Sequence, residues 1–135
     1  MQMNGVIIDT SAWIEFFNKS DSEISNTVRN IVSDNTTIYL CPIIWQEILQ
    51  GIKLDKDFKE IKYIFSFYPI LKTDPMEIAE KAVDIYRTTR KNGITIRKSN
   101  DCSIAAYAIL NNLVLLQYDR DFKQMQKVIK ELKLL

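Results

Sequence analysis

Apolar and polar positions alternate along this chain in blocks that predict strands and helices in turn. Short runs rich in Val, Ile and Leu, which are typical of strands buried in a parallel sheet, predict strands over 5–9, 37–40 and 113–119. The stretches between them repeat their apolar residues every three or four positions, as amphipathic helices do. This order of strands and helices is the pattern of an α/β fold with a mainly parallel sheet.

Capping and turn residues place the ends of these elements. The hydroxyls of Thr10 and Ser11 can cap the first helix, Ser99 or Asn100 can cap the sixth, and the Asn-Gly pair at 92–93 ends the fifth. We expect helices over 10–17, 22–32, 43–52, 56–66, 74–91, 100–111 and 121–130, with short strands over 67–71 and 132–135. Without repeats or a Pro/Gly-rich linker, residues 1–135 are expected to form one domain.

The composition excludes several function classes. A net charge of +1 argues against broad, non-specific binding to nucleic acid by a polycation. No apolar stretch approaches the length of a membrane span, and the first nine residues lack the pattern of a signal peptide. Cys41 and Cys102 form no close-spaced motif and fit a reducing compartment. We therefore expect a cytoplasmic protein without membrane contact.

Four acidic residues stand where a parallel sheet would gather them. Asp9 and Asp119 each end an apolar run, and ligands of open α/β sheets bind just past the carboxyl ends of the strands. Asp101 lies in the first turn of the apolar helix 100–111, and Glu47 lies mid-helix at the border of an apolar face. Each has an ordinary explanation as a cap, a turn residue, a first-turn acid or an acid that reaches solvent. Their combination indicates a shared site.

Such a cluster restricts the chemistry. Two like charges 4 Å apart repel by about 4 kcal/mol at an effective dielectric near 20, so gathered carboxylates share protons or hold a cation. Because the chain contains no histidine, its ligands would be oxygen atoms, which select Mg²⁺ or Mn²⁺ over zinc. A cation of this kind lowers the pKa of its bound water and offsets charge on a phosphodiester undergoing hydrolysis.

Three segments resemble the motifs of PIN-domain nucleases, most closely the VapC-type toxins of toxin–antitoxin pairs. These are residues 8–13 (Ile-Asp-Thr-Ser-Ala-Trp), 97–106 and 115–122, and Glu47 falls where the family has its second acid. The resemblance implies an α/β/α sandwich, a homodimer and a Mg²⁺- or Mn²⁺-dependent endoribonuclease masked by a small antitoxin. One departure is Gln117, where the family usually has Thr or Ser.

The resemblance also implies roles for individual residues. The acidic centre would be Asp9, Glu47, Asp101 and Asp119, with metal ligation by Asp9, Asp101 and Asp119, and with Ser11 and Asp121 as accessory residues. The basic stretch 87–98, which alone would be a solvated helix end and loop, could hold an RNA backbone through Arg90, Lys91, Arg97 and Lys98. The aromatic side chains of Trp13, Phe16 and Phe17 are better explained by core or dimer packing than by base stacking.

Two other functions stay open. A catalytically weak PIN-fold protein could bind RNA or an antitoxin, and Gln117 is the feature that points to it. A HAD-like phosphatase also begins with an apolar strand ending in aspartate, but its second acid would stand where this chain has Ser11.

Overall fold

A short parallel sheet lies at the centre of the fold. The computed structural model describes residues 5–135. Its strands are β1 (Val6–Ile8), β2 (Ile38–Tyr39) and β3 (Val114–Leu116), in the order β2-β1-β3 with every pairing parallel. β1 is fully buried between its two neighbours, as an unbroken apolar run predicts.

Seven helices surround the sheet in the described residues. Their bounds are α1 (Thr10–Phe17), α2 (Glu23–Ser33), α3 (Pro42–Gln50), α4 (Asp55–Phe65), α5 (Pro75–Lys91), α6 (Ser99–Leu110) and α7 (Arg120–Gln126). None of the helices in residues 5–135 is long and apolar enough to cross a membrane. The expectation that the last helix reaches residue 130 is wrong. α7 ends at Gln126, whose side-chain amide donates to the Leu132 carbonyl at 2.9 Å and so turns the chain back toward β3.

The two short strands expected over 67–71 and 132–135 are reduced to single bridges. Ile70 bridges to Leu40 beside β2, and Leu134 bridges to Leu115 in β3, both in parallel. The backbone around Leu115 accepts from Leu135 and donates to Lys133. Both outer edges of the sheet therefore have partners that limit exposed backbone groups.

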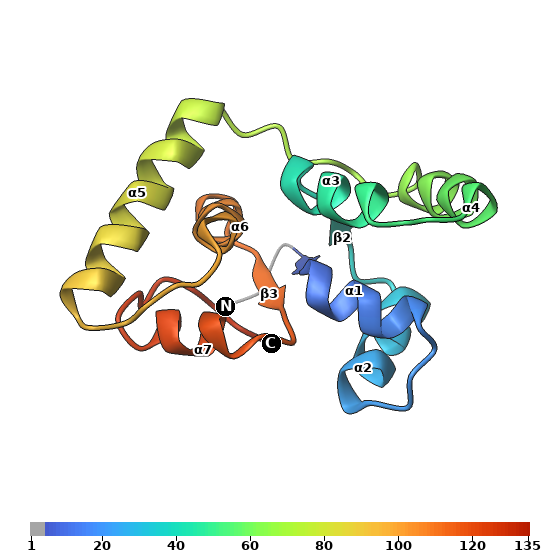
Figure 1. The fold of residues 1–135 in the computed structure, drawn as a ribbon, viewed down its shortest axis with the longest axis horizontal. Coiled ribbons are helices and arrows are strands. Elements are labelled where there is room, and N and C mark those ends of the chain that lie inside the picture. Colours follow the sequence, from blue (N-terminus) through green and yellow to red (C-terminus); the bar gives the residue numbers. More distant parts are fainter. Residues whose placement is uncertain (1–4) are drawn as a thin grey trace.

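The helices form two layers, with the sheet between them. In Figure 1, α3 and α6 lie above the strands, and α1, α2 and α7 lie below them. Strand order explains this, because the chain moves from β1 outward to β2 and then back across β1 to β3. Right-handed crossovers in opposite directions put their helices on opposite faces. The expected three-layer α/β/α sandwich is confirmed, and the strand order reverses between β1 and β3.

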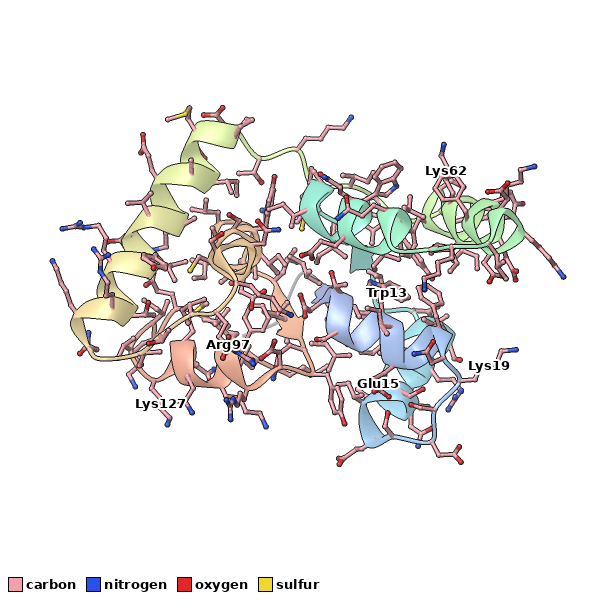
Figure 2. The ribbon with its side chains drawn as sticks, in the orientation of Figure 1. Trp13, Glu15, Lys19, Lys62, Arg97 and Lys127 are labelled. Atoms are coloured by element: carbon pink, nitrogen blue, oxygen red, sulfur yellow. The ribbon has the colours of Figure 1, made fainter. Side chains whose placement is uncertain are left out.

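The first helix contributes aromatic side chains to the core. Trp13 is fully buried; its ring is stacked on Phe17 at 5.4 Å and tilted against Phe65, in α4, at 5.3 Å between centroids. Figure 2 shows Trp13 on α1 below α3. The expectation that these aromatic residues serve packing is thus confirmed for the core.

Candidate active site

Asp9 begins α1 and also faces the site. Its backbone is extended, and its side chain accepts from the Ser11 backbone N–H at 3.2 Å and from the Ser11 hydroxyl at 2.6 Å. The expectation that Thr10 or Ser11 caps this helix is wrong, because both already lie inside it and a carboxylate at the cap position reaches the second N–H. Burial to 4% exposure raises the pKa of Asp9 against the opposing effect of the Ser11 hydrogen bonds.

Ser11 joins the ends of two strands. While its hydroxyl donates to Asp9, its oxygen accepts the backbone N–H of Tyr118 at 3.1 Å. Tyr118 follows β3, so the hydroxyl connects the residues just past the carboxyl ends of β1 and β3. These ends meet where the strand order reverses, which is the usual place for a ligand in an open α/β sheet.

Asp119 begins α7 in the same way. Its side chain accepts a hydrogen bond from the Asp121 backbone N–H at 3.0 Å, so Asp119 is the cap of this helix. The expectation from the turn pattern, that Asp121 is the cap, is wrong. The Asp119 backbone N–H in turn donates to the Gln117 side-chain oxygen at 2.6 Å. The longer amide of Gln117 therefore orders this segment where a hydroxyl is usual in the family.

Asp101 is the most unusual acid of the group. It lies in the first turn of α6 with 5% of its surface exposed, and its Oδ2 has no hydrogen-bond partner in residues 5–135. Burial, followed by the nearby charges of Asp9 and Asp119, raises its pKa to about 7. Carboxylate oxygens of Asp101, Asp119 and Asp121 all lie within 4.8 Å of one another.

Glu47 reaches the same region from α3. The Thr10 hydroxyl donates to Glu47 Oε1 at 2.7 Å, and the Asn100 amide donates to Oε2 at 3.5 Å. The expectation that Ser99 or Asn100 caps α6 is wrong. Both residues lie inside the helix, and the residue at the cap position, Lys98, forms no capping hydrogen bond with its side chain. The negative charge of Glu47 contributes to the raised pKa values of Asp9 and Asp101, so Glu47 lies close enough to interact with both carboxyl groups.

Two of the four basic residues expected to contact RNA reach the acidic cluster. Arg97 donates from Nε to Asp121 and from a terminal nitrogen to Asp119, both at 3.0 Å, and Lys98 Nζ lies 3.7 Å from Asp119. Figure 2 shows Arg97 beside α7. Arg90 and Lys91 lie exposed at the end of α5, where the Arg90 guanidinium covers the Tyr86 ring at 5.5 Å. The basic stretch thus has two parts: Arg97 and Lys98 lie against acidic side chains, and Arg90 and Lys91 are exposed to solvent.

These residues suit a hard divalent cation. The carboxylates of Asp101 on α6 and of Asp119 and Asp121 at the start of α7 converge, and one of their oxygens, Asp101 Oδ2, is buried without a partner among the described residues. A buried carboxylate oxygen without a partner is costly unless the carboxyl is protonated or a cation binds there. A donor set made only of oxygen fits Mg²⁺ or Mn²⁺. Arg97 is the cation that neutralises Asp119 and Asp121 in this structure.

Sequence reasoning assembled the acids but missed several of their neighbours. Thr10 and Asn100 orient Glu47, and both were interpreted only as helix caps. Asp121 was treated as accessory, although its carboxylate belongs to the compact group and is 4% exposed. Its place in the first turn of α7, two residues after Asp119, is the signal that could have shown this. The pairing with Arg97 had no signal, since 24 residues separate Arg97 from Asp121.

Comparison with known proteins gives consistent matches. The PIN-domain family model matches residues 6–128. Ribonuclease VapC11 of Mycobacterium tuberculosis and a VapC ribonuclease of Mycobacterium bovis are each 34% identical over 124 residues, covering 91% of this chain and 92% of theirs. Similar solved structures include VapBC2 from Rickettsia felis (TM-score 0.74, 19% identity) and VapBC-1 from Haemophilus influenzae (0.72, 19%), each covering 96% of both chains. The chain therefore belongs to the PIN-domain family, in the group of its VapC relatives.

Proposed function

We propose that this protein is a metal-dependent endoribonuclease toxin that hydrolyses RNA phosphodiester bonds and is neutralised by a cognate antitoxin. One observation carries the proposal: the carboxylates of Asp9 just past β1, Glu47 on α3, Asp101 on α6 and Asp119 at the start of α7 lie close enough to act on one another electrostatically. A buried oxygen of Asp101 is left without a partner among the described residues. The curated relatives support the reaction class, because their names describe ribonucleases.

The roles follow from position. Asp9, Asp101 and Asp119 would hold Mg²⁺ or Mn²⁺. Asp101 and Asp119 form the compact group with Asp121, and Asp9 lies outside it but close enough for its charge to raise the pKa of Asp101. When bound, the cation supplies a more acidic water and offsets the charge of the phosphate. Ser11 keeps the Asp9 carboxylate fixed through its 2.6 Å hydrogen bond.

The remaining polar groups act on substrate and water. Glu47, oriented by Thr10 and Asn100, lies outside the compact group of acids and would accept a proton from the attacking water. Arg97 and Lys98 lie within 4 Å of Asp119, so a phosphate bound at the acids would meet their positive charges. Arg90 and Lys91 would contact RNA further along its backbone. Accessible single-stranded or looped RNA is the proposed substrate.

The proposed partners rest on separate observations. Several similar structures are VapBC complexes, and their titles support an antitoxin partner for this chain. A homodimer is supported by exposed apolar side chains on two neighbouring helices, namely Met76, Val83 and Tyr86 on α5 and Leu110 at the end of α6. We place the protein in the cytoplasm, where RNA and a reducing environment for its two buried free cysteines are found.

The decisive test removes single charges from the acidic group. Asp9→Asn and Asp101→Asn are expected to reduce RNA cleavage by at least a hundredfold while circular dichroism stays native, and EDTA is expected to stop cleavage by the unaltered protein. Asp84→Asn, on the exposed face of α5, is the matched control. Cleavage at the normal rate by both site variants would disprove the mechanism.

The weak-binding alternative loses its support at Gln117. The side chain of that residue holds the Asp119 backbone at 2.6 Å, so the departure from the family pattern leaves Asp119 ordered. A calorimetric titration tests this directly: Mn²⁺ binding in the presence of RNA favours the enzyme, and no binding at millimolar metal favours the alternative.

A further inference from the structure

A pocket of about 620 Å³ lies directly beside the acidic group, between the start of α2 and the segment that joins β3 to α7. Asp119 belongs to both the pocket and the acidic group. We propose that this pocket binds the base of the nucleotide next to the cleaved bond, with that base stacked on Tyr118. The inference rests on the proposed function, because it takes single-stranded RNA as the substrate.

Tyr118 has the properties of a stacking platform. Tyr118 is 57% exposed, and its ring packs against no other aromatic ring of residues 5–135. Its backbone is nevertheless fixed, since its N–H donates to the Ser11 hydroxyl at 3.1 Å. Single-stranded RNA is commonly held by bases that stack on exposed aromatic side chains. A tyrosine whose backbone is held by a hydrogen bond and whose ring is exposed to solvent is suited to stacking on a base.

The lining of the pocket fits a nucleotide. Ile24, Leu116 and Leu135 offer apolar surface for a base, while Thr27 and Gln117 offer polar groups for its edge. Arg120 and Lys123 add positive charge, and neither forms an ion pair with a described residue. The volume lies within the range of small-ligand pockets, roughly 300–1,000 Å³. Among the described residues that line the pocket, the acidic side chains are those of Glu23 and Asp119.

The position of the pocket determines which nucleotide it takes. Tyr118 precedes Asp119 directly in the chain, so their Cα atoms are about 3.8 Å apart. A phosphate bound at the acidic group therefore leaves the neighbouring base within reach of Tyr118. This subsite would make cleavage depend on stacking rather than on hydrogen-bond readout, and purines, with the larger ring surface, would be preferred there.

The test measures RNA binding without cleavage. In a Glu47→Gln background with Mg²⁺, which keeps the three proposed metal ligands, the affinity for a fluorescein-labelled oligoadenylate decamer is measured by fluorescence anisotropy. Tyr118→Ala is expected to weaken binding on the order of tenfold, the loss of one base stack. Tyr118→Phe should stay close to the background. Tyr63→Ala is the matched control, because Tyr63 is similarly exposed (66%) but lies on α4.

A second measurement locates the base. Single abasic nucleotides are moved along the decamer. One position is expected to weaken binding in the background and to have no further effect in Tyr118→Ala, as two changes that remove the same stack do. Unchanged affinity of Tyr118→Ala, or full additivity at every abasic position, would overturn the proposal and point to another occupant.

The cations of the pocket give an independent readout. Lys123→Ala is expected to reduce the salt dependence of binding by about one phosphate contact, whereas Lys127→Ala, at the far end of α7 in Figure 2, should not. Equal salt slopes in both variants would count against the pocket. If the Glu47→Gln background bound no RNA and the unaltered protein cleaved none, the proposed function itself would fail. Failure at Tyr118 alone would leave that function intact.

Discussion

At the residue scale, Asp101 combines burial with negative neighbours. Its carboxylate is 5% exposed, and its pKa of about 7 reflects burial first and the charges of Asp9 and Asp119 second. Lys98 acts in the opposite direction. Without a divalent cation the protonated form of Asp101 is therefore favoured below about pH 7, and a bound cation would favour the charged form.

This predicts an uncommon pH dependence of stability. Between the ordinary aspartate pKa of 3.8 and about 7, the folded protein keeps a proton that the unfolded chain has released. The free energy of unfolding of the metal-free protein should therefore fall as pH rises through that window, by at most about 4 kcal/mol for Asp101. Urea unfolding in EDTA, compared between about pH 5 and about pH 8, measures it.

The same experiment on Asp101→Asn provides the control. The amide cannot ionise, so this variant should show a shallower pH dependence and exceed the unaltered protein in stability at the higher pH. A slope that Asp101→Asn leaves unchanged would mean that Asp101 is charged in the metal-free fold.

Gln117 yields a prediction about support for Asp119. Gln117→Ala removes the 2.6 Å acceptor of the Asp119 N–H at a site where Gln117 is only 8% exposed. We expect a loss of about 1 kcal/mol in unfolding free energy and a several-fold slower cleavage. Gln117→Thr should retain more activity, and Gln46→Ala, exposed on α3, should change neither quantity. Native cleavage by Gln117→Ala would show that Asp119 needs no such support.

At the element scale, the acids that face the site also start helices. Asp9 caps α1 and Asp119 caps α7, each by accepting the N–H two residues on. One side chain thereby sets where a helix begins and aims a carboxylate past the end of a strand. The two requirements agree, because a capping carboxylate lies at the positive end of its helix.

Substitution at Asp9 should separate these two roles. Asparagine caps a helix about as well as aspartate, whereas alanine costs about 1 kcal/mol. Asp9→Asn and Asp9→Ala are therefore both expected to lose RNA cleavage, but only Asp9→Ala should lose stability by that amount. Urea unfolding measures the stability of each variant, and a cleavage assay measures its activity. Equal stability of Asp9→Asn and Asp9→Ala would show that Asp9 does not stabilise α1 as a cap.

At the scale of the whole molecule, the site joins parts distant in sequence. The bond between Ser11 and Tyr118 spans 107 residues, and that between Thr10 and Glu47 spans 37. Carboxylates contributed by α6 and α7 meet those at the ends of β1 and in α3. A cation bound there would connect elements from both layers and therefore stabilise the fold as a unit.

The expected consequence is a metal-dependent melting temperature. At a Mn²⁺ concentration about 100 times its dissociation constant, linkage adds about 2.7 kcal/mol, which raises the melting temperature by several degrees. Differential scanning fluorimetry with and without EDTA measures the shift, and KCl at matched ionic strength is the control. Asp101→Asn should lose it; the same shift in that variant would place the cation elsewhere.

The sequence by itself determined the strands, most helix bounds and the candidate acids. Short apolar runs and helical spacing depend on near neighbours, so β1 and α5 lie close to where they are expected. The expectation that the strand over 113–119 ends on Asp119 is wrong, because β3 ends at Leu116 and the chain then turns to cap α7. The position of Asp9 and Asp119 just past two such runs was enough to predict that parallel strands would bring them together.

Only the tertiary structure decided how each acid is held. It showed that Asp119 rather than Asp121 caps α7, that Arg97 is paired with both, and that Asp101 keeps a buried oxygen without a partner in the described residues. It also showed that the last helix ends at Gln126 and that the two short strands expected over 67–71 and 132–135 are single bridges. These outcomes depend on contacts between segments far apart in the chain, where packing and charge, rather than local pattern, select among partners of similar chemistry.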